Sequence, residues 1–512
     1  MLNPIRKIKT INASLKNNVI ITFITIVGIV IGFLSQMVIA SYFGATKYMD
    51  AYLAASVVPS YLTSVLIGSL GFVFIPVFID NIAKDRHHEA WLIASTFANL
   101  LLIILSFLSI FGLIFADSII SLTAPGLSLE THQIAVRIFR ILWPSIITIG
   151  ITTLSISIYQ SFSRFIWSSA VPALGALFTL ILILLLVKKF GINGLAIATL
   201  GGLIIQTLLL LPIFFKPGNY RSVLKLMNPG FRQIIQLYLP LFAVSIFSKS
   251  TTLAERYFAS ELPGGSISHL SYAFKILTVA IVVISTSIST TVFPKLATQL
   301  ASNDIGQFRN TISKSFIFMW MALVPAVIMG MILSFPFIVT VFQRGQFNVG
   351  DSEAVTVLLQ ILLLSVPAAC LGGITGKIFY VQKKTKTLAV FGIFESVSYL
   401  IYTYYLSKYF GVIGIAIGYV IYFNLSNLWQ MLYLRFTKTI TNLNIINSFF
   451  KIFFAAGLGG LFTLFIIKLI DKPFYQLIIG ALSGSSIYII MLYLFKVKEL
   501  NFRSVKIRHT DL

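Results

Sequence analysis

The stretch that decides the fold is KKFGINGLAI at residues 188–197, because it returns as KYFGVIGIAI at residues 408–417. The offset is 220 residues, and each copy joins one long apolar segment to the next. A second pair agrees, since Phe74-Ile75-Pro76 has a counterpart in Val292-Phe293-Pro294. A repeat of this length in an apolar chain indicates a transporter with two similar halves and the substrate path between them.

The composition excludes a soluble globular protein. Of the 512 residues, 57% are hydrophobic and only 10% are charged, and the mean hydropathy is +0.94. So few polar residues could not cover the outside of a soluble protein of this length. The first apolar run, residues 19–42, matches the ~20 residues that span a bilayer, so we expect an uncleaved helix rather than a signal peptide. The single cysteine, Cys370, excludes an intramolecular disulfide.

The apolar segments number about fourteen, which predicts an all-α polytopic membrane protein. Their expected bounds are 19–43, 51–79, 90–116, 132–159, 167–187, 192–215, 233–258, 267–292, 315–342, 354–379, 388–407, 412–433, 446–470 and 475–495. The first six and the second six form two repeats in the same orientation. We therefore predict an N-terminal six-helix lobe at 1–216, a connector at 217–232, a C-terminal six-helix lobe at 233–434, and two further helices with a basic tail at 435–512. Interior prolines should kink or interrupt helices, namely Pro59, Pro144, Pro240, Pro325 and Pro367.

The formal net charge of +23 indicates topology rather than nucleic-acid binding. The predicted segments on the side of the two termini hold 24 of the 38 lysines and arginines, whereas the opposite loops hold 7. Positive charge accumulates on the cytoplasmic side, so both termini are expected there. The same excess attracts anionic lipid headgroups.

Motifs of enzymes are nearly absent. The sequence has no Walker A loop, no dinucleotide fingerprint and no pair of histidines at metal-ligand spacing. We therefore expect no cofactor, no metal and no covalent chemistry.

Charged residues inside the predicted spans are the candidate functional residues. Each costs ~2.5–3.5 kcal/mol on insertion scales, so each should face a cavity or a partner. The candidates for substrate binding are Lys275, Arg137, Arg140 and Arg256, and those for ion coupling or charge pairing are Glu255 and Glu395. Snorkelling to the membrane boundary is the alternative for Arg137 and Arg256, and a buried structural pair is the alternative for Glu395. Several cations with few acids suit an anionic headgroup such as a pyrophosphate-linked sugar, and disfavour an exporter of cationic drugs.

Several short stretches, in order and at matching spacing, resemble the MurJ/MviN family of lipid II flippases, part of the superfamily that includes multidrug exporters and polysaccharide flippases. They are Gly32-Phe33, residues 42–45 with Asp50-Ala51, Phe74-Ile75-Pro76, residues 123–126, residues 255–260, residues 265–268 with Tyr272-Ala273, and residues 342–347. The resemblance implies fourteen helices, both termini inside, a central cavity that opens to either side, and a lipid groove along the last two helices.

The sequence departs from the family pattern at several cations. The arginines and the following acid that members carry in the first helix correspond to Ile29, Ser35 and Gln36, and the arginine pair after Pro59 corresponds to Thr63 and Ser64. The Asp-Arg pair of the eighth helix is Phe274-Lys275, so only the cation remains. Arg137 and Arg140 are the cations that could compensate.

The resemblance implies a flippase that moves a lipid-linked glycan precursor, a lipid II-like undecaprenyl-pyrophosphate sugar, from the inner to the outer leaflet of the bacterial cytoplasmic membrane by alternating access. The expected partners are this substrate, membrane lipids and a coupling cation, with no nucleic acid. One alternative is a flippase for an exopolysaccharide or O-antigen precursor, which the lost arginines favour. Another is a non-transporting membrane partner in envelope assembly.

Overall fold

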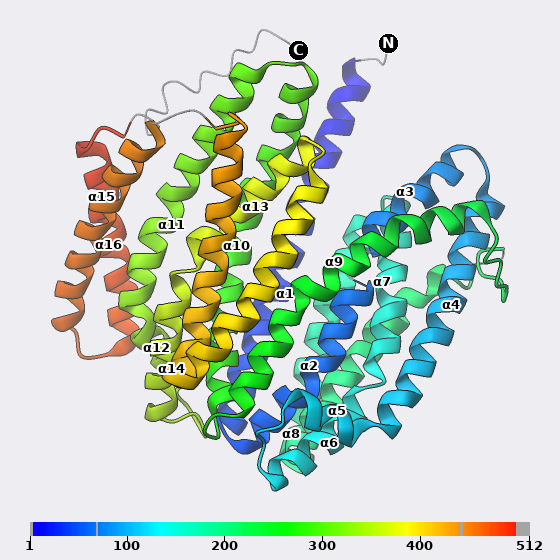
Figure 1. The fold of residues 1–512 in the computed structure, drawn as a ribbon, viewed down its shortest axis with the longest axis horizontal. Helices are drawn as coiled ribbons and strands as arrows, with labels where there is room; N and C mark the ends of the chain where they lie inside the picture. Colours follow the sequence, from blue (N-terminus) through cyan, green and yellow to red (C-terminus); the bar gives the residue numbers. More distant parts are fainter. Residues whose placement is uncertain (1–3, 68–69, 217, 441–443, 498–512) are drawn as a thin grey trace. The chain divides into compact units, whose positions relative to one another are not determined.

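The computed structural model describes residues 4–67, 70–216, 218–440 and 444–497, and all regular structure in these ranges is helical (Figure 1). Ten of the described helical stretches are long and apolar enough to cross a membrane. The predicted all-α membrane architecture is confirmed.

The chain forms two compact units, one of residues 1–268 with 344–346 and the other of residues 269–343 with 347–512. The helices of the first unit are α1 (Pro4–Phe43), α2 (Lys47–Ile67), α3 (Leu70–Ala83), α4 (His87–Ile114), α5 (Ala116–Thr123), α6 (Leu129–Leu142), α7 (Ser145–Ser161), α8 (Phe165–Leu210), the 3-10 helix η1 (Leu211–Ile213) and α9 (Pro229–Ser260). Helix α10 (Ser266–Ala301) begins in the first unit and continues in the second. The others of the second unit are α11 (Ile305–Phe342), α12 (Val349–Leu363), α13 (Val366–Val381), α14 (Thr385–Phe436), α15 (Asn444–Lys468) and α16 (Pro473–Leu494).

The repeated motif of the sequence forms the same one-residue turn in both units. Gly191 in α8 has φ 56° and ψ −134°, and Gly411 in α14 has φ 58° and ψ −136°. Residues with a Cβ rarely adopt this backbone conformation, whereas glycine adopts it without steric cost. The equivalence of the two glycines therefore carries the internal repeat from the sequence into the backbone.

The chain returns along itself after each of these turns. A Cβ on Gly194 would lie 2.5 Å from the carbonyl oxygen of Leu186, and a Cβ on Gly414 would collide with the carbonyl oxygen of Leu406. Contacts of this kind across the turn mean that α8 and α14 are each an antiparallel hairpin of two helices. With the two hairpins counted as two crossings each, and with α2 and α10 added, the described helices accommodate the number of crossings predicted from the sequence.

The prolines act differently from one another. Pro144 precedes α7 directly and Pro367 lies in the first turn of α13, where a missing N–H costs nothing. Each thereby marks a break within an apolar segment that the sequence predicts as continuous. The helices continue through Pro59, Pro240 and Pro325, so an interruption is wrong at those three positions.

Helix α9 follows the sequence boundary of the second half but packs in the first unit, against α2, α3 and α4. The Tyr61 hydroxyl donates to the Ile246 carbonyl at 3.2 Å, and the Tyr238 hydroxyl donates to the Leu66 carbonyl. Phe231 at its start is 4% exposed and lies 6.1 Å from the ring of Phe97 in the aromatic core. The boundary of the repeat and the boundary of packing therefore differ by one helix.

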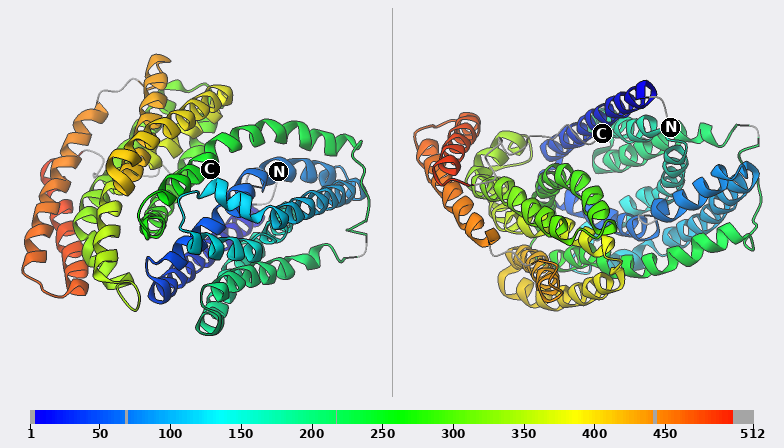
Figure 2. Two further views of the ribbon diagram at one scale, coloured as in Figure 1. Left: turned by 60° about the horizontal axis from the view of Figure 1, so that its bottom comes forward. Right: turned by 90° about the horizontal axis from the view of Figure 1, so that it is seen from above.

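Helices α15 and α16 run side by side and pack on α11 (Figures 1 and 2). Their close approach depends on small residues, because a Cβ on Gly484 would collide with the Thr463 hydroxyl. Thr463 donates to the Gly480 carbonyl at 3.2 Å, and the Tyr488 hydroxyl donates to the Met321 carbonyl of α11 at 2.7 Å. Small residues and interhelical hydrogen bonds are what hold helices together in lipid.

Candidate functional site

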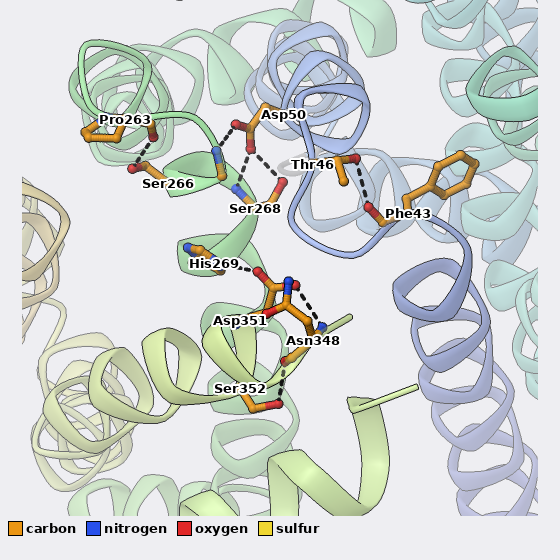
Figure 3. A network of polar contacts seen from close by, with 11 residues as sticks. Phe43, Thr46, Asp50, Pro263, Ser266, Ser268, His269, Asn348, Asp351 and Ser352 are labelled. Atoms are coloured by element: carbon orange, nitrogen blue, oxygen red, sulfur yellow. Dashed lines mark hydrogen bonds and ion pairs between the residues drawn. The ribbon is translucent and has the colours of Figure 1, made fainter. Parts of the chain in front are cut away.

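Asp50 on α2 holds the turn between α9 and α10 within the first unit (Figure 3). Its carboxylate accepts hydrogen bonds from the Gly265 N–H at 2.6 Å, the Ser268 N–H at 2.9 Å and the Ser268 hydroxyl at 2.6 Å. Asp50 is only 4% exposed. The N–H groups at the start of a helix lack partners within the helix and favour negative charge, so this distant carboxylate caps α10.

Arg256 and Glu255 lie beside this cap, at the end of α9. The Arg256 guanidinium donates to the Ile267 carbonyl at 3.1 Å and lies in the electrostatic range of Glu255 and Asp50. Glu255 is 8% exposed. The structure therefore brings these two predicted residues together with Asp50, at the α9–α10 turn.

Arg137 and Arg140 are both exposed on α6, opposite the buried face formed by residues such as Ala135, Ile138 and Leu142. Neither pairs with a carboxylate in the part of the chain that the structure describes. The start of α6 is tied to the start of α2, because Lys47 and Glu130 form an ion pair at 2.7 Å. These features leave two adjacent guanidinium groups available on a fixed helix.

Lys275 is exposed on α10, one residue after Phe274, whose ring contacts Tyr419 of α14 with centroids 4.7 Å apart. Lys377 on α13 is half-buried and lies 5.9 Å from the ring centroid of Phe293. The environments of the two lysines therefore differ, since an aromatic face attracts the Lys377 ammonium.

Glu395 lies at the end of a polar chain that crosses the interior of the second unit. Thr375 of α13 donates to the Gln430 side-chain oxygen, and Gln430 donates to the Ser426 hydroxyl at 3.1 Å. The Ser426 hydroxyl is in turn the hydrogen-bond partner of the Glu395 carboxyl group. Glu395 and Ser426 belong to the two antiparallel arms of α14, so the Gly411 turn is what brings them together.

One oxygen of Glu395 is left over. The side chain is 7% exposed, and its Oε1 has no hydrogen-bond partner among the described residues. No lysine or arginine forms an ion pair with it in those ranges. A buried carboxylate in this situation takes up a proton or a cation, because its charge is otherwise uncompensated.

Sequence reasoning missed several of these residues. Asp50, Ser426, Gln430 and Thr375 act through partners far away in the chain, and only Asp50 stands in a stretch that resembles the family. His269 is another, since its Nε2 lies 2.8 Å from the Asp351 carboxylate, which also forms a capping box with Asn348 at the start of α12 (Figure 3).

The described residues contain no group of three or more His, Cys, Asp or Glu side chains that could hold a metal ion.

The duplicated hairpins and the many apolar helices define the class of protein, a multi-pass helical membrane transporter built from two similar halves. The family model described as "Lipid II flippase MurJ" matches residues 39–484, so the chain belongs to this family and is a multi-pass protein of the inner membrane. The resemblance seen in the sequence is thereby confirmed.

Relatives and solved structures agree with this assignment. The "Probable lipid II flippase MurJ" of Bdellovibrio bacteriovorus is 26% identical over 381 residues, which cover 73% of each chain. A solved structure titled "Lipid II flippase MurJ, inward closed conformation" is 24% identical with a TM-score of 0.81, covering 94% of this chain and 99% of that one. An inward-facing multidrug resistance MATE family transporter of the MOP superfamily is 18% identical with a TM-score of 0.69, covering 81% and 98%. The last two likenesses concern the fold.

Proposed function

We propose that this protein moves a lipid-linked glycan precursor, of the lipid II type with an undecaprenyl-pyrophosphate sugar, from the inner to the outer leaflet of the bacterial cytoplasmic membrane. The observation that carries the proposal is the family match over residues 39–484, in a chain whose two halves repeat the same helical hairpin. Two similar halves support transport by alternating access, in which they rock about a central site. The headgroup crosses in the cavity while the lipid tail stays in the membrane.

The proposed contacts for the pyrophosphate are Arg137, Arg140 and Lys275. All three are exposed on their helices, and the two arginines are free of ion pairs among the described residues. Guanidinium groups suit this task because they donate several charge-assisted hydrogen bonds to phosphate oxygens. Arg256 is the weaker candidate, since it already donates to the backbone of the α9–α10 turn. Glu255, its neighbour, is proposed to pair with that charge.

Glu395 is the proposed ligand of a coupling ion. The support is its buried carboxyl group with an unpartnered oxygen, beside the hydroxyl of Ser426 and within electrostatic range of Tyr402. Titratable groups of this kind inside a membrane protein mark ion pathways. Uptake of a proton or cation at this position would make the second unit sensitive to an ion gradient.

The test of the proposed substrate is complementation of a strain depleted of its lipid II flippase. We expect growth with the wild-type chain and a loss of growth with Arg137→Ala/Arg140→Ala at equal membrane levels. A wild-type chain that is well expressed yet supports no growth would contradict lipid II transport and favour the exopolysaccharide precursor.

Both termini are proposed to be cytoplasmic, with the 24-to-7 charge asymmetry as the support. Single cysteines at Lys225 and Lys384, introduced with Cys370→Ala, should resist a membrane-impermeant thiol reagent in intact cells. Ready labelling at these positions would overturn the topology.

A further inference from the structure

A basic pocket lies between the end of α10 and the start of α11 in the second unit. Its cavity volume is about 690 Å³, within the range of about 300–1,000 Å³ found for ligand pockets. The described side chains that line it are Val292, Lys295, Gln299, Thr311, Lys314, Ser315 and Phe318. The lining thus contains two cations and no carboxylate.

The lining changes from polar to apolar in the same direction along both helices. On α10, Gln299 lies nearest the helix end, Lys295 one turn further in and Val292 deepest. On α11, Thr311 lies nearest the start, followed by Lys314 and Ser315, and then by Phe318. The two helices have 36 and 38 residues, more than the ~20 that a bilayer requires, so the ends that carry the lysines lie at headgroup depth.

The polar groups of the pocket are available for a ligand. Neither Lys295 nor Lys314 pairs with a carboxylate in the described ranges. The side-chain Oε1 of Gln299 is buried and has no hydrogen-bond partner among the described residues. A buried polar atom without a partner costs free energy, which a ligand that carries a hydroxyl or amine donor would recover.

The first half of the repeat shows that the fold does not require this pocket. Lys295 directly follows Pro294, and the corresponding residue after Pro76 is Val77. Val77 is 5% exposed and belongs to the aromatic core of the first unit, whereas Lys295 is exposed and lines the pocket. The second half therefore has a cation and a cavity at a position where the first half has packed apolar side chains.

We propose that this pocket binds the phosphate group of a membrane lipid, with Lys295 and Lys314 on the phosphate and Val292 and Phe318 along the start of the acyl or prenyl chain. Ammonium groups are suitable point charges for phosphate, and polybasic positions at a membrane surface attract anionic headgroups. This site is separate from the cations proposed for transport and does not depend on the identity of the glycan.

The experiment compares lipid binding by native mass spectrometry of the full chain in detergent. The probes are phosphatidylglycerol, undecaprenyl phosphate, zwitterionic phosphatidylcholine and inorganic phosphate. The test variant is Lys295→Gln/Lys314→Gln, and the matched control is Lys225→Gln/Lys386→Gln, which removes two exposed lysines outside the pocket. Lys295→Arg/Lys314→Arg keeps both charges and serves as the rescue.

We expect the test variant to bind phosphatidylglycerol, undecaprenyl phosphate or both about tenfold more weakly or worse, with binding kept in the control and in the rescue variant. A loss confined to phosphatidylglycerol would assign the site to bulk phospholipid, and a loss confined to undecaprenyl phosphate would assign it to the carrier of the substrate. Unchanged binding in a test variant that melts like the wild type would overturn the proposal. An equal loss in the control, or inorganic phosphate bound as tightly as either lipid, would overturn it as well.

Discussion

Glu395→Gln separates a coupling role from a structural role. The side chain forms no ion pair in the described part of the chain, so the change leaves no cation stranded. Glutamine keeps the length of the side chain and its contact with Ser426, so the free energy of unfolding should change by no more than about one hydrogen bond, ~1 kcal/mol. Loss of one partner from a buried ion pair would instead cost about 3–5 kcal/mol.

The assay measures flipping of a fluorescent lipid-linked substrate in proteoliposomes, with and without an imposed ion gradient or membrane potential, and melting of the same sample in detergent. We expect Glu395→Gln to flip without dependence on the gradient and to melt within about 2 °C of the wild type. Glu353→Gln removes an exposed acid of α12 and is the control for charge. A variant that is stable and still responds to the gradient refutes the coupling role, and a large drop in melting temperature refutes our account of its surroundings.

Three further predictions follow from contacts described above. Lys275→Ala should lower flipping far more than Lys377→Ala at equal expression, and equally mild losses would indicate that Lys275 only snorkels. Asp50→Ala strands two backbone N–H groups at the start of α10, which should cost about 2–6 kcal/mol and lower the melting temperature by several degrees, and a variant that melts like the wild type would contradict the capping role. Gly411→Ala meets no neighbour within 4 Å and should cost only the backbone strain of about 1–2 kcal/mol. Gly414→Ala collides with backbone and should destabilise more, so the reverse order on melting would contradict the hairpin geometry.

The fold could be predicted from the sequence because lipid imposes strong rules on composition. Apolar runs of bilayer length identify the crossings, and a glycine at the same place in both halves identifies the turn of each hairpin. The breaks at Pro144 and Pro367 could be expected, but the helices that continue through Pro59, Pro240 and Pro325 could not. Neighbouring helices decide whether a proline interrupts a membrane helix, and a single sequence does not contain their positions.

The candidate site was less accessible to sequence reasoning. Glu395 stands out because a carboxylate in an apolar segment is rare, whereas its partner Ser426 looks like any other small polar residue of a membrane helix. Arg256 also stands out as a charge, yet its contact with the Ile267 carbonyl depends on a turn whose shape Asp50 determines from a distant helix. A charge can be found by its cost, but its partner is set by packing.

The one-residue turns also determine which residues face each other along each hairpin. Glu395 lies 16 residues before Gly411 and Ser426 lies 15 after it, and the same steps from Gly191 lead to Gly175 and Gln206. These two do face each other, since a Cβ on Gly175 would lie 2.8 Å from the Gln206 side-chain oxygen. The duplicated frame thus has a neutral amide over a glycine in one copy and a carboxylate beside a hydroxyl in the other. This pair of positions offers one ionisable group per protein, which sets a stoichiometry of one proton or cation taken up there in each transport cycle.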